Sequence, residues 1–155
     1  MASIYVEESL LKLSSGSDES LLDIFVGQGN PFGLNAQFYG YCAALGKSKK
    51  NFKEPKEKST TGEVKSGTFE NNNLCGLIFA IALDEKKDLD ILRDTDTCYK
   101  IFEGYVNGGL EIIHEKSKNL ENEELIVSLM LDVKKQADKN IKFEDDVDPG
   151  GELEL

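Results

Sequence analysis

Two adjacent glycines interrupt the longest helical pattern in the sequence. Between Asp96 and Lys118, apolar residues recur at spacings of three and four, as on one face of an α-helix; they are Ile101, Phe102, Tyr105, Val106, Leu110, Ile112 and Ile113. Asn107-Gly108-Gly109 lies within this pattern, although each glycine costs a helix about 1 kcal/mol relative to alanine. Either one helix ends at Asn107 and a second begins near Leu110, or the helix continues and another backbone packs against the glycines. We favour the break.

The rest of the chain adds shorter helical patterns and no long alternating strand pattern. Helices are predicted within residues 2–13, after an N-cap at Ser17 or Asp18, from Asn35 to Leu45 with Gly46 just past the end, within residues 68–84, and from Glu121 or Asn122 onward. The segment 68–84 is apolar on nearly all sides, which predicts a buried, central helix. The sequence therefore predicts a mainly α, compact single-domain fold of about five to six helices.

Size and composition fit a folded domain with two polar additions. The 155 residues are 39% hydrophobic and 30% charged, which is typical of a soluble globular protein long enough to form a core. We expect a helical domain at 1–140 that includes a basic, flexible connection at 47–67. We expect a disordered acidic tail at 141–155, because it carries too little apolar surface to offset its ordering entropy. Neither a membrane span nor a signal peptide is expected.

The charge is distributed unevenly. The net charge is −11, which argues against a protein that coats nucleic acid on its own. Residues 47–65 nevertheless carry seven lysines against three glutamates; these candidate DNA- or partner-binding residues are Lys47, Lys49, Lys50, Lys53, Lys56, Lys58 and Lys65. The first interpretation is a solvated, mobile loop. The functional alternative is an electrostatic contact for phosphates or an acidic partner, although only Phe52 could stack on a base.

No catalytic or metal-binding pattern stands out. The single histidine, His114, has no nucleophile or orienting group nearby, and the three cysteines have no metal-ligand spacing. We expect buried free thiols at Cys42, Cys75 and Cys98, and hence a cytoplasmic protein. The carboxylates between residues 84 and 96 are expected to form a solvated rim, with metal binding as the minor alternative. The sequence thus predicts no enzyme, no cofactor and no metal.

Several motifs carry a family resemblance. PFGLNAQFYGYCAALG, TFENNNLCGLIFAIAL, DLDIL and IFEGYVNGGLEII, between Pro31 and Glu115, resemble a small protein family encoded with the bacterial DNA phosphorothioation (Dnd) modification and restriction systems. The chain departs from the family pattern at Gly104-Tyr105-Val106, where EYA is expected, and at Cys42, where alanine is expected. The resemblance implies no catalytic residues. It implies only that Asn107, Gly108, Gly109 and Glu111 are structural signatures.

Three functional hypotheses follow from the resemblance and the charge. The first is a non-enzymatic accessory or adaptor protein of a phosphorothioation-dependent modification or anti-phage restriction system, which docks onto other proteins of that system, with or without DNA nearby. The second is a direct DNA-binding module that uses the lysine-rich loop, multiplied by assembly into a homo-oligomer. The third is an acidic DNA mimic that inhibits a DNA-binding protein.

Overall fold

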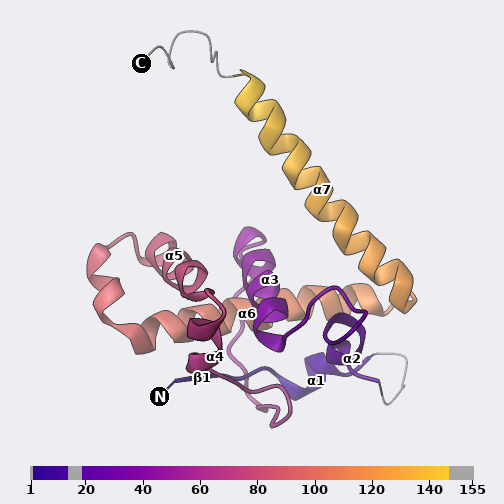
Figure 1. Ribbon diagram of the computed structural model, residues 1–155, viewed down its shortest axis with the longest axis horizontal. Coiled ribbons are helices and arrows are strands. Elements are labelled where there is room, and N and C mark those ends of the chain that lie inside the picture. The colour runs from indigo at the N-terminus through magenta and orange to yellow at the C-terminus, as the bar shows by residue number, and fades with distance from the viewer. Residues whose placement is uncertain (1, 14–18, 147–155) are drawn as a thin grey trace. The chain divides into compact units, whose positions relative to one another are not determined.

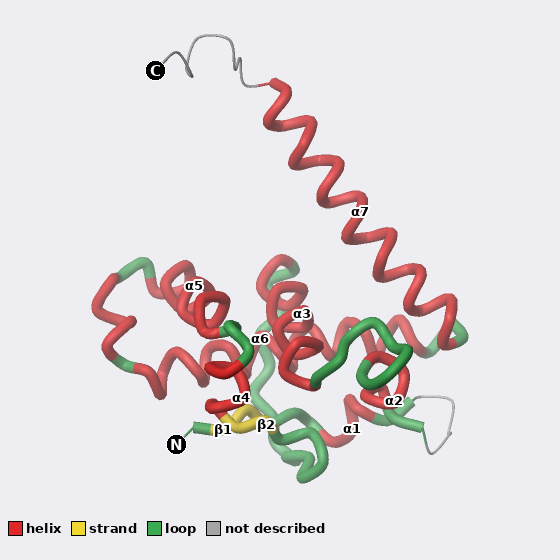
Figure 2. Tube along the Cα trace, in the orientation of Figure 1, coloured by secondary structure: helices red, strands yellow, loops and turns green. Residues whose placement is uncertain are grey.

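The computed structural model describes residues 2–13 and 19–146 and divides the chain into two compact units, Met1–Asn119 and Leu120–Leu155. The described residues confirm the mainly α class, with seven α-helices where about five to six were predicted (Figures 1 and 2). The elements in chain order are β1 (Ser3–Ile4), α1 (Glu8–Leu11), α2 (Leu21–Phe25), α3 (Asn35–Ser48), β2 (Val64–Lys65), α4 (Ser66–Asn71), α5 (Cys75–Lys86), the 3₁₀ helix η1 (Leu89–Arg93), α6 (Thr95–Ser117) and α7 (Asn122–Asp146).

Helix α6 is the centre of the first unit and runs without a break through the two glycines. The favoured break at Asn107 is therefore wrong, and the alternative, close backbone packing, is correct. Asp94 caps the helix by accepting a hydrogen bond from the Thr97 amide, 3.2 Å away. The helix tolerates its glycines because tertiary packing, rather than intrinsic propensity, supplies most of a protein helix's stability.

Helix α3 crosses α6 at a point where neither helix has a side chain. A β-carbon on Gly46 would lie 2.2 Å from the Tyr105 carbonyl oxygen, and one on Gly109 would lie 1.8 Å from the Cys42 carbonyl oxygen. Real β-carbons essentially never approach other atoms closer than 3.0 Å. Glycine on both helices therefore allows the two backbones to touch.

Aromatic side chains fill the core around this crossing. On α3, Phe38 is fully buried and stacks on Phe25 of α2 with ring centroids 4.9 Å apart. On α6, Phe102 is fully buried and meets Phe69 of α4 edge to face at 5.3 Å. Such pairs stabilise a core beyond the area they bury.

Helix α5 is less central than its composition suggested. Only Ile78, Ile81 and Ala82 of this apolar helix are buried, so the expectation of a buried central element at 68–84 is wrong. The segment also divides into α4 and α5, which are separated by Asn72, Asn73 and Leu74, and Asn73 adopts a positive φ of 59°. The central position belongs to α6, whose amphipathic pattern was the stronger signal.

The N-terminal segment forms more than the single short helix predicted for residues 2–13. Ser3–Ile4 pairs antiparallel with Val64–Lys65, and only Glu8–Leu11 is helical. Of the predicted N-caps of the next helix, Ser17 and Asp18 lie outside the described residues. Ser20 occupies the cap position of α2 instead, and its amide donates to the Asp23 carboxylate at 2.9 Å.

The second unit consists of α7 in its described part. The helix continues through Asp146, past residue 141 where the sequence suggested that an acidic disordered tail begins, and residues 147–155 lie outside the description. No helix in the described ranges is both long enough and apolar enough to cross a membrane.

Candidate functional site

The basic segment (residues 47–65) is the candidate site, and α6 is the platform that holds it. Gly104 and Gly108 lie one helical turn apart and leave room for its backbone and for one ring. A β-carbon on Gly108 would lie 1.6 Å from the Asn51 carbonyl oxygen, and one on Gly104 would lie 2.0 Å from the Phe52 ring. The glycines of α6 therefore serve two contacts: Gly109 receives α3, while Gly104 and Gly108 receive the basic segment.

Asn51 and Glu111 fasten the start of the basic segment to this platform. The Asn51 side-chain amide donates to the Gly108 carbonyl oxygen at 2.8 Å and to the Glu111 carboxylate at 3.2 Å. The Glu111 carboxylate also lies 3.5 Å from Lys53 Nζ, and the Lys53 amide donates to the Gly104 carbonyl oxygen at 3.0 Å. Glu111 thus positions the segment through hydrogen bonds as well as charge.

Asn107 holds the N-terminal segment on the same helix. It is fully buried; its side-chain oxygen accepts from the Glu7 amide at 2.8 Å, and its side-chain nitrogen donates to the carbonyl oxygens of Tyr5 at 3.0 Å and Glu103 at 2.9 Å. The Tyr5 amide in turn donates to the Glu103 carboxylate at 2.9 Å. Burial is the main reason that the pKa of Glu103 is raised. The side chain of Asn107 is therefore fully used within the fold.

The N-terminal segment in turn anchors the middle of the basic segment. The Glu7 carboxylate accepts from the Lys56 amide at 2.6 Å and from the Glu57 amide at 3.2 Å, and the Ser59 amide donates to the Val6 carbonyl oxygen at 2.8 Å. The Tyr39 hydroxyl donates to the Gly62 carbonyl oxygen at 2.6 Å. Residues 51–63 have no regular helix or strand, yet their backbone is attached at several points, which differs from the solvated, mobile connection that the sequence suggested. This irregular backbone is stable because the Glu7 carboxylate and the Tyr39 hydroxyl form hydrogen bonds with its amide and carbonyl groups.

Three of the seven candidate lysines have partners in the fold. Lys47 Nζ lies 2.8 Å from the Glu85 carboxylate and 3.0 Å from that of Asp84, and it lies over the Tyr105 ring at 5.2 Å. Lys53 pairs with Glu111, and Lys58 lies over the Tyr5 ring at 4.6 Å. These three lysines connect elements of the first unit to one another.

Lys47, Asp84, Glu85 and Tyr105 form a polar cluster in which the pKa of each member is shifted. The hydrogen bond from Lys47 is the main reason that the pKa of Glu85 is lowered, and the bond to Glu85 is the main reason that the pKa of Lys47 is raised. The Tyr105 hydroxyl also bonds to the Glu85 carboxylate at 2.5 Å, and burial is the largest cause of the raised pKa of Tyr105. The cluster joins α3, α5 and α6 and remains partly exposed.

The other four candidate lysines remain open to solvent. Lys49, Lys50, Lys56 and Lys65 are exposed, and the described part of the chain offers none of them an ion pair. Lys50 follows α3 with a positive φ of 55°, at the point where the chain turns onto α6. The structure therefore reduces the seven candidates to four cations on an anchored backbone.

The remaining candidates from the sequence do not form a chemical site. Cys42 and Cys98 are buried, and burial is the main cause of the raised pKa of each thiol, which keeps both protonated. His114 lies in the last turn of α6, and its Nδ1 is buried without a hydrogen bond to any described residue. Within residues 2–13 and 19–146, no group of histidine, cysteine and carboxylate side chains could hold a metal ion.

The first unit is a small helical domain in which two helix backbones touch at the centre and an anchored basic segment lies on the surface. The family described as DNA sulphur modification system-associated protein 4 matches residues 18–148. The chain belongs to this family, which is associated with the DNA sulphur modification (Dnd) system. The match extends beyond Pro31–Glu115, the range of the sequence resemblance. No curated protein and no solved structure matches the chain.

Proposed function

We propose that this protein is a non-enzymatic adaptor that docks onto another protein of the DNA sulphur modification system through its basic segment. The observation that carries the proposal is the attachment of that segment. Its backbone is fixed to α6 and to Glu7, while Lys49, Lys50, Lys56 and Lys65 extend into solvent.

Anchoring the backbone favours recognition. A mobile loop loses conformational freedom when it binds, whereas a segment that is already ordered loses less. The four open lysines also lie on a protein whose net charge is −11, so the positive region is local. A local excess of positive charge within one segment steers an acidic partner toward that segment.

The first test is capture of the neighbouring gene products. The tagged full chain is expressed with its gene neighbours, and the proteins that purify with it are identified at low and at physiological salt. We expect at least one protein of the modification system to purify with the wild-type chain. Loss of every such protein at both salt concentrations would contradict the adaptor function.

A matched pair of variants then tests the basic segment. The first variant changes Lys49, Lys50, Lys56 and Lys65 to alanine. The control changes four exposed lysines elsewhere, namely Lys12, Lys86, Lys100 and Lys139, to alanine. Both variants move the net charge from −11 to −15, so they separate position from overall charge. We expect only the first variant to lose the partner, and equal loss in both would refute the assignment of the surface.

Direct DNA binding is the second candidate function, and the same four open lysines favour it. Phe52, 47% exposed, adds a ring within the same segment, although that ring also packs on Tyr105. If four lysines contact phosphates, the slope of log affinity against log salt should flatten by about 3 to 4 when all four are changed to alanine. Binding to plain and phosphorothioate-bearing duplexes across a salt series measures this slope. Binding that is absent, or independent of salt, would remove this candidate.

A further inference from the structure

Helix α7 presents an apolar stripe that no part of the proposed adaptor surface uses. Val127, Met130 and Leu131 lie at spacings of three and four and are 54%, 58% and 52% exposed. Three large apolar side chains side by side on one helical face are typical of an interaction surface. Leu125 and Leu129 lie on a different face of the helix and are buried. The exposed stripe is therefore separate from the buried apolar face of α7.

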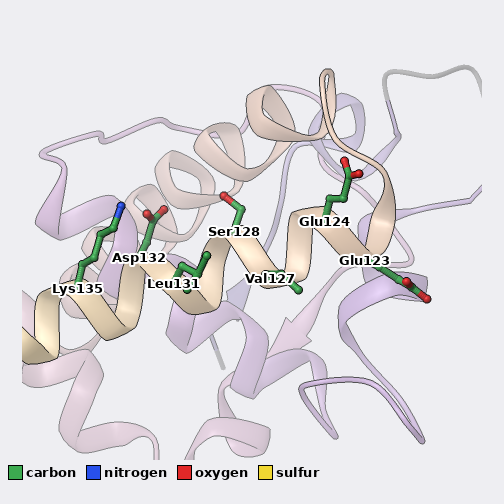
Figure 3. A pocket seen from close by; sticks show the side chains of 7 residues that line it. All are labelled: Glu123, Glu124, Val127, Ser128, Leu131, Asp132 and Lys135. Carbon is green, nitrogen blue, oxygen red and sulfur yellow. The ribbon is translucent and has the colours of Figure 1, made fainter.

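The charges at the two ends of the stripe are opposite in sign. Glu123 and Glu124 precede it by about one turn, and Lys134 and Lys135 follow it by about one turn. All four side chains are exposed. Figure 3 shows the side chains that line a shallow hollow along α7, with Val127, Ser128 and Leu131 in the middle, Glu123 and Glu124 at one end, and Lys135 with Asp132 at the other.

This pattern is complementary to itself when one copy is reversed. We infer that the exposed stripe of α7 is a self-association surface, on which α7 of a second copy of this chain lies antiparallel. The two-fold axis that relates the copies crosses the helices at the level of residue 129. In that arrangement Val127 faces Leu131 of the second copy, Glu124 faces Lys134, and Glu123 faces Lys135. Because the interface is symmetric, each contact occurs twice. A parallel arrangement would instead place carboxylates against carboxylates and lysines against lysines, which is unfavourable.

The expected dimer is modest in strength. Residues 123–135 span about 20 Å of helix at 1.5 Å per residue. A stable interface usually buries about 800 Å² on each partner, and a single pair of helices of this length buries less. The monomer and dimer should therefore exchange with concentration, and salt should weaken the dimer because the flanking charges are exposed. Dimerisation would also bring two basic segments into one assembly, whether or not the adaptor function is correct.

Sedimentation equilibrium on the full chain tests the inference directly. The mass should rise from 17.2 kDa toward twice that value as the concentration increases. Glu123→Lys with Glu124→Lys makes the flanking residues all positive, and Lys134→Glu with Lys135→Glu makes them all negative. Each double variant alone should weaken dimerisation by about tenfold or more, because every cross-pair becomes repulsive. An equal mixture of the two should restore the dimer, since every cross-pair is then attractive.

Two further measurements decide orientation and folding. Glu124→Cys mixed with Lys134→Cys should form a disulfide between the two chains much faster than either variant alone, as only the antiparallel arrangement brings the two positions together. Circular dichroism of the charge variants should match the wild type, because all four positions are exposed. A wild-type chain that stays monomeric at every concentration would overturn the inference. So would a dimer whose affinity neither charge reversal changes, or capture of α7 by another protein of the system in place of a second copy.

Discussion

Gly109→Ala is the most direct test of the backbone contact between α3 and α6. A methyl group at residue 109 would lie 1.8 Å from the Cys42 carbonyl oxygen, 2.6 Å from the Cys42 carbonyl carbon and 2.9 Å from its α-carbon. Ordinary contact begins near 3.4 Å, so the closest pair would have to separate by about 1.6 Å. Every clashing atom belongs to a helix backbone, so no side-chain rotation can relieve the contact.

The size of the effect follows from two opposing contributions. Alanine is a better helix former than glycine, which stabilises the variant by about 1 kcal/mol. Overpacking a core destabilises by about 1–3 kcal/mol, and this site lies at or beyond the upper end because only backbone atoms are present to move. The net expectation is a loss of about 2 kcal/mol or more in the free energy of unfolding. For a chain of this length that corresponds to a fall in Tm of about 4–8 °C.

Chemical and thermal denaturation followed by circular dichroism measure this loss. Gly76→Ala is the matched control, because Gly76 is also helical and nothing lies within 4 Å of the β-carbon it would gain. The control should be as stable as the wild type or slightly more stable, by up to about 1 kcal/mol. If Gly109→Ala proved as stable as Gly76→Ala, the close crossing of α3 and α6 would be incorrect.

Four further variants probe the polar contacts. Asn107→Leu leaves the Glu7 amide and the Tyr5 carbonyl unpaired, so the free energy of unfolding should fall by about 2 kcal/mol or more in urea denaturation. Glu85 has a folded pKa below its ordinary value of 4.5, so it stabilises the fold above about pH 4.5 and loses this effect as the pH falls through the folded pKa. Lys47→Met should therefore reduce the loss of stability on acidification. Glu103 has a raised pKa, so the opposite sign holds: Glu103→Gln should remove a loss of stability that begins above pH 4.5. Glu111→Gln keeps an acceptor for Asn51 but loses the charge facing Lys53, so thermal melts should shift by only a few degrees.

Local sequence signals predicted the helical elements well. The N-terminal boundary at Asn35 and the start of the final helix at one of two adjacent residues, Glu121 or Asn122, were predicted correctly, because each depends on residues within a few positions of one another. The mainly α class follows from the same periodicity. Boundaries failed where pairing is distant, as at Ser3–Ile4, whose strand partner lies about 60 residues later.

The candidate site could not be derived in the same way. Seven lysines look equivalent in the sequence, but Lys47 is paired by acidic residues 37 and 38 positions away, which no local pattern reveals. The glycine pair marked an unusual position, yet a break and a close contact have the same signature in one sequence. The two possibilities are distinguished only by the tertiary structure, in which the backbones of Cys42 and Asn51 pack against the glycines of α6.

The contacts of Asn107 also determine the order in which the chain can become structured. The N-terminal segment is held by hydrogen bonds that span 98, 100 and 102 residues. At about 5–20 residues per second, synthesis separates the two ends of these bonds by about 5–20 s. During that interval Ile4 and Val6, both fully buried in the finished fold, have no helix α6 to cover them. Residues 3–6 are thus among the last to be ordered, because the helix that covers them is synthesised about 100 residues later.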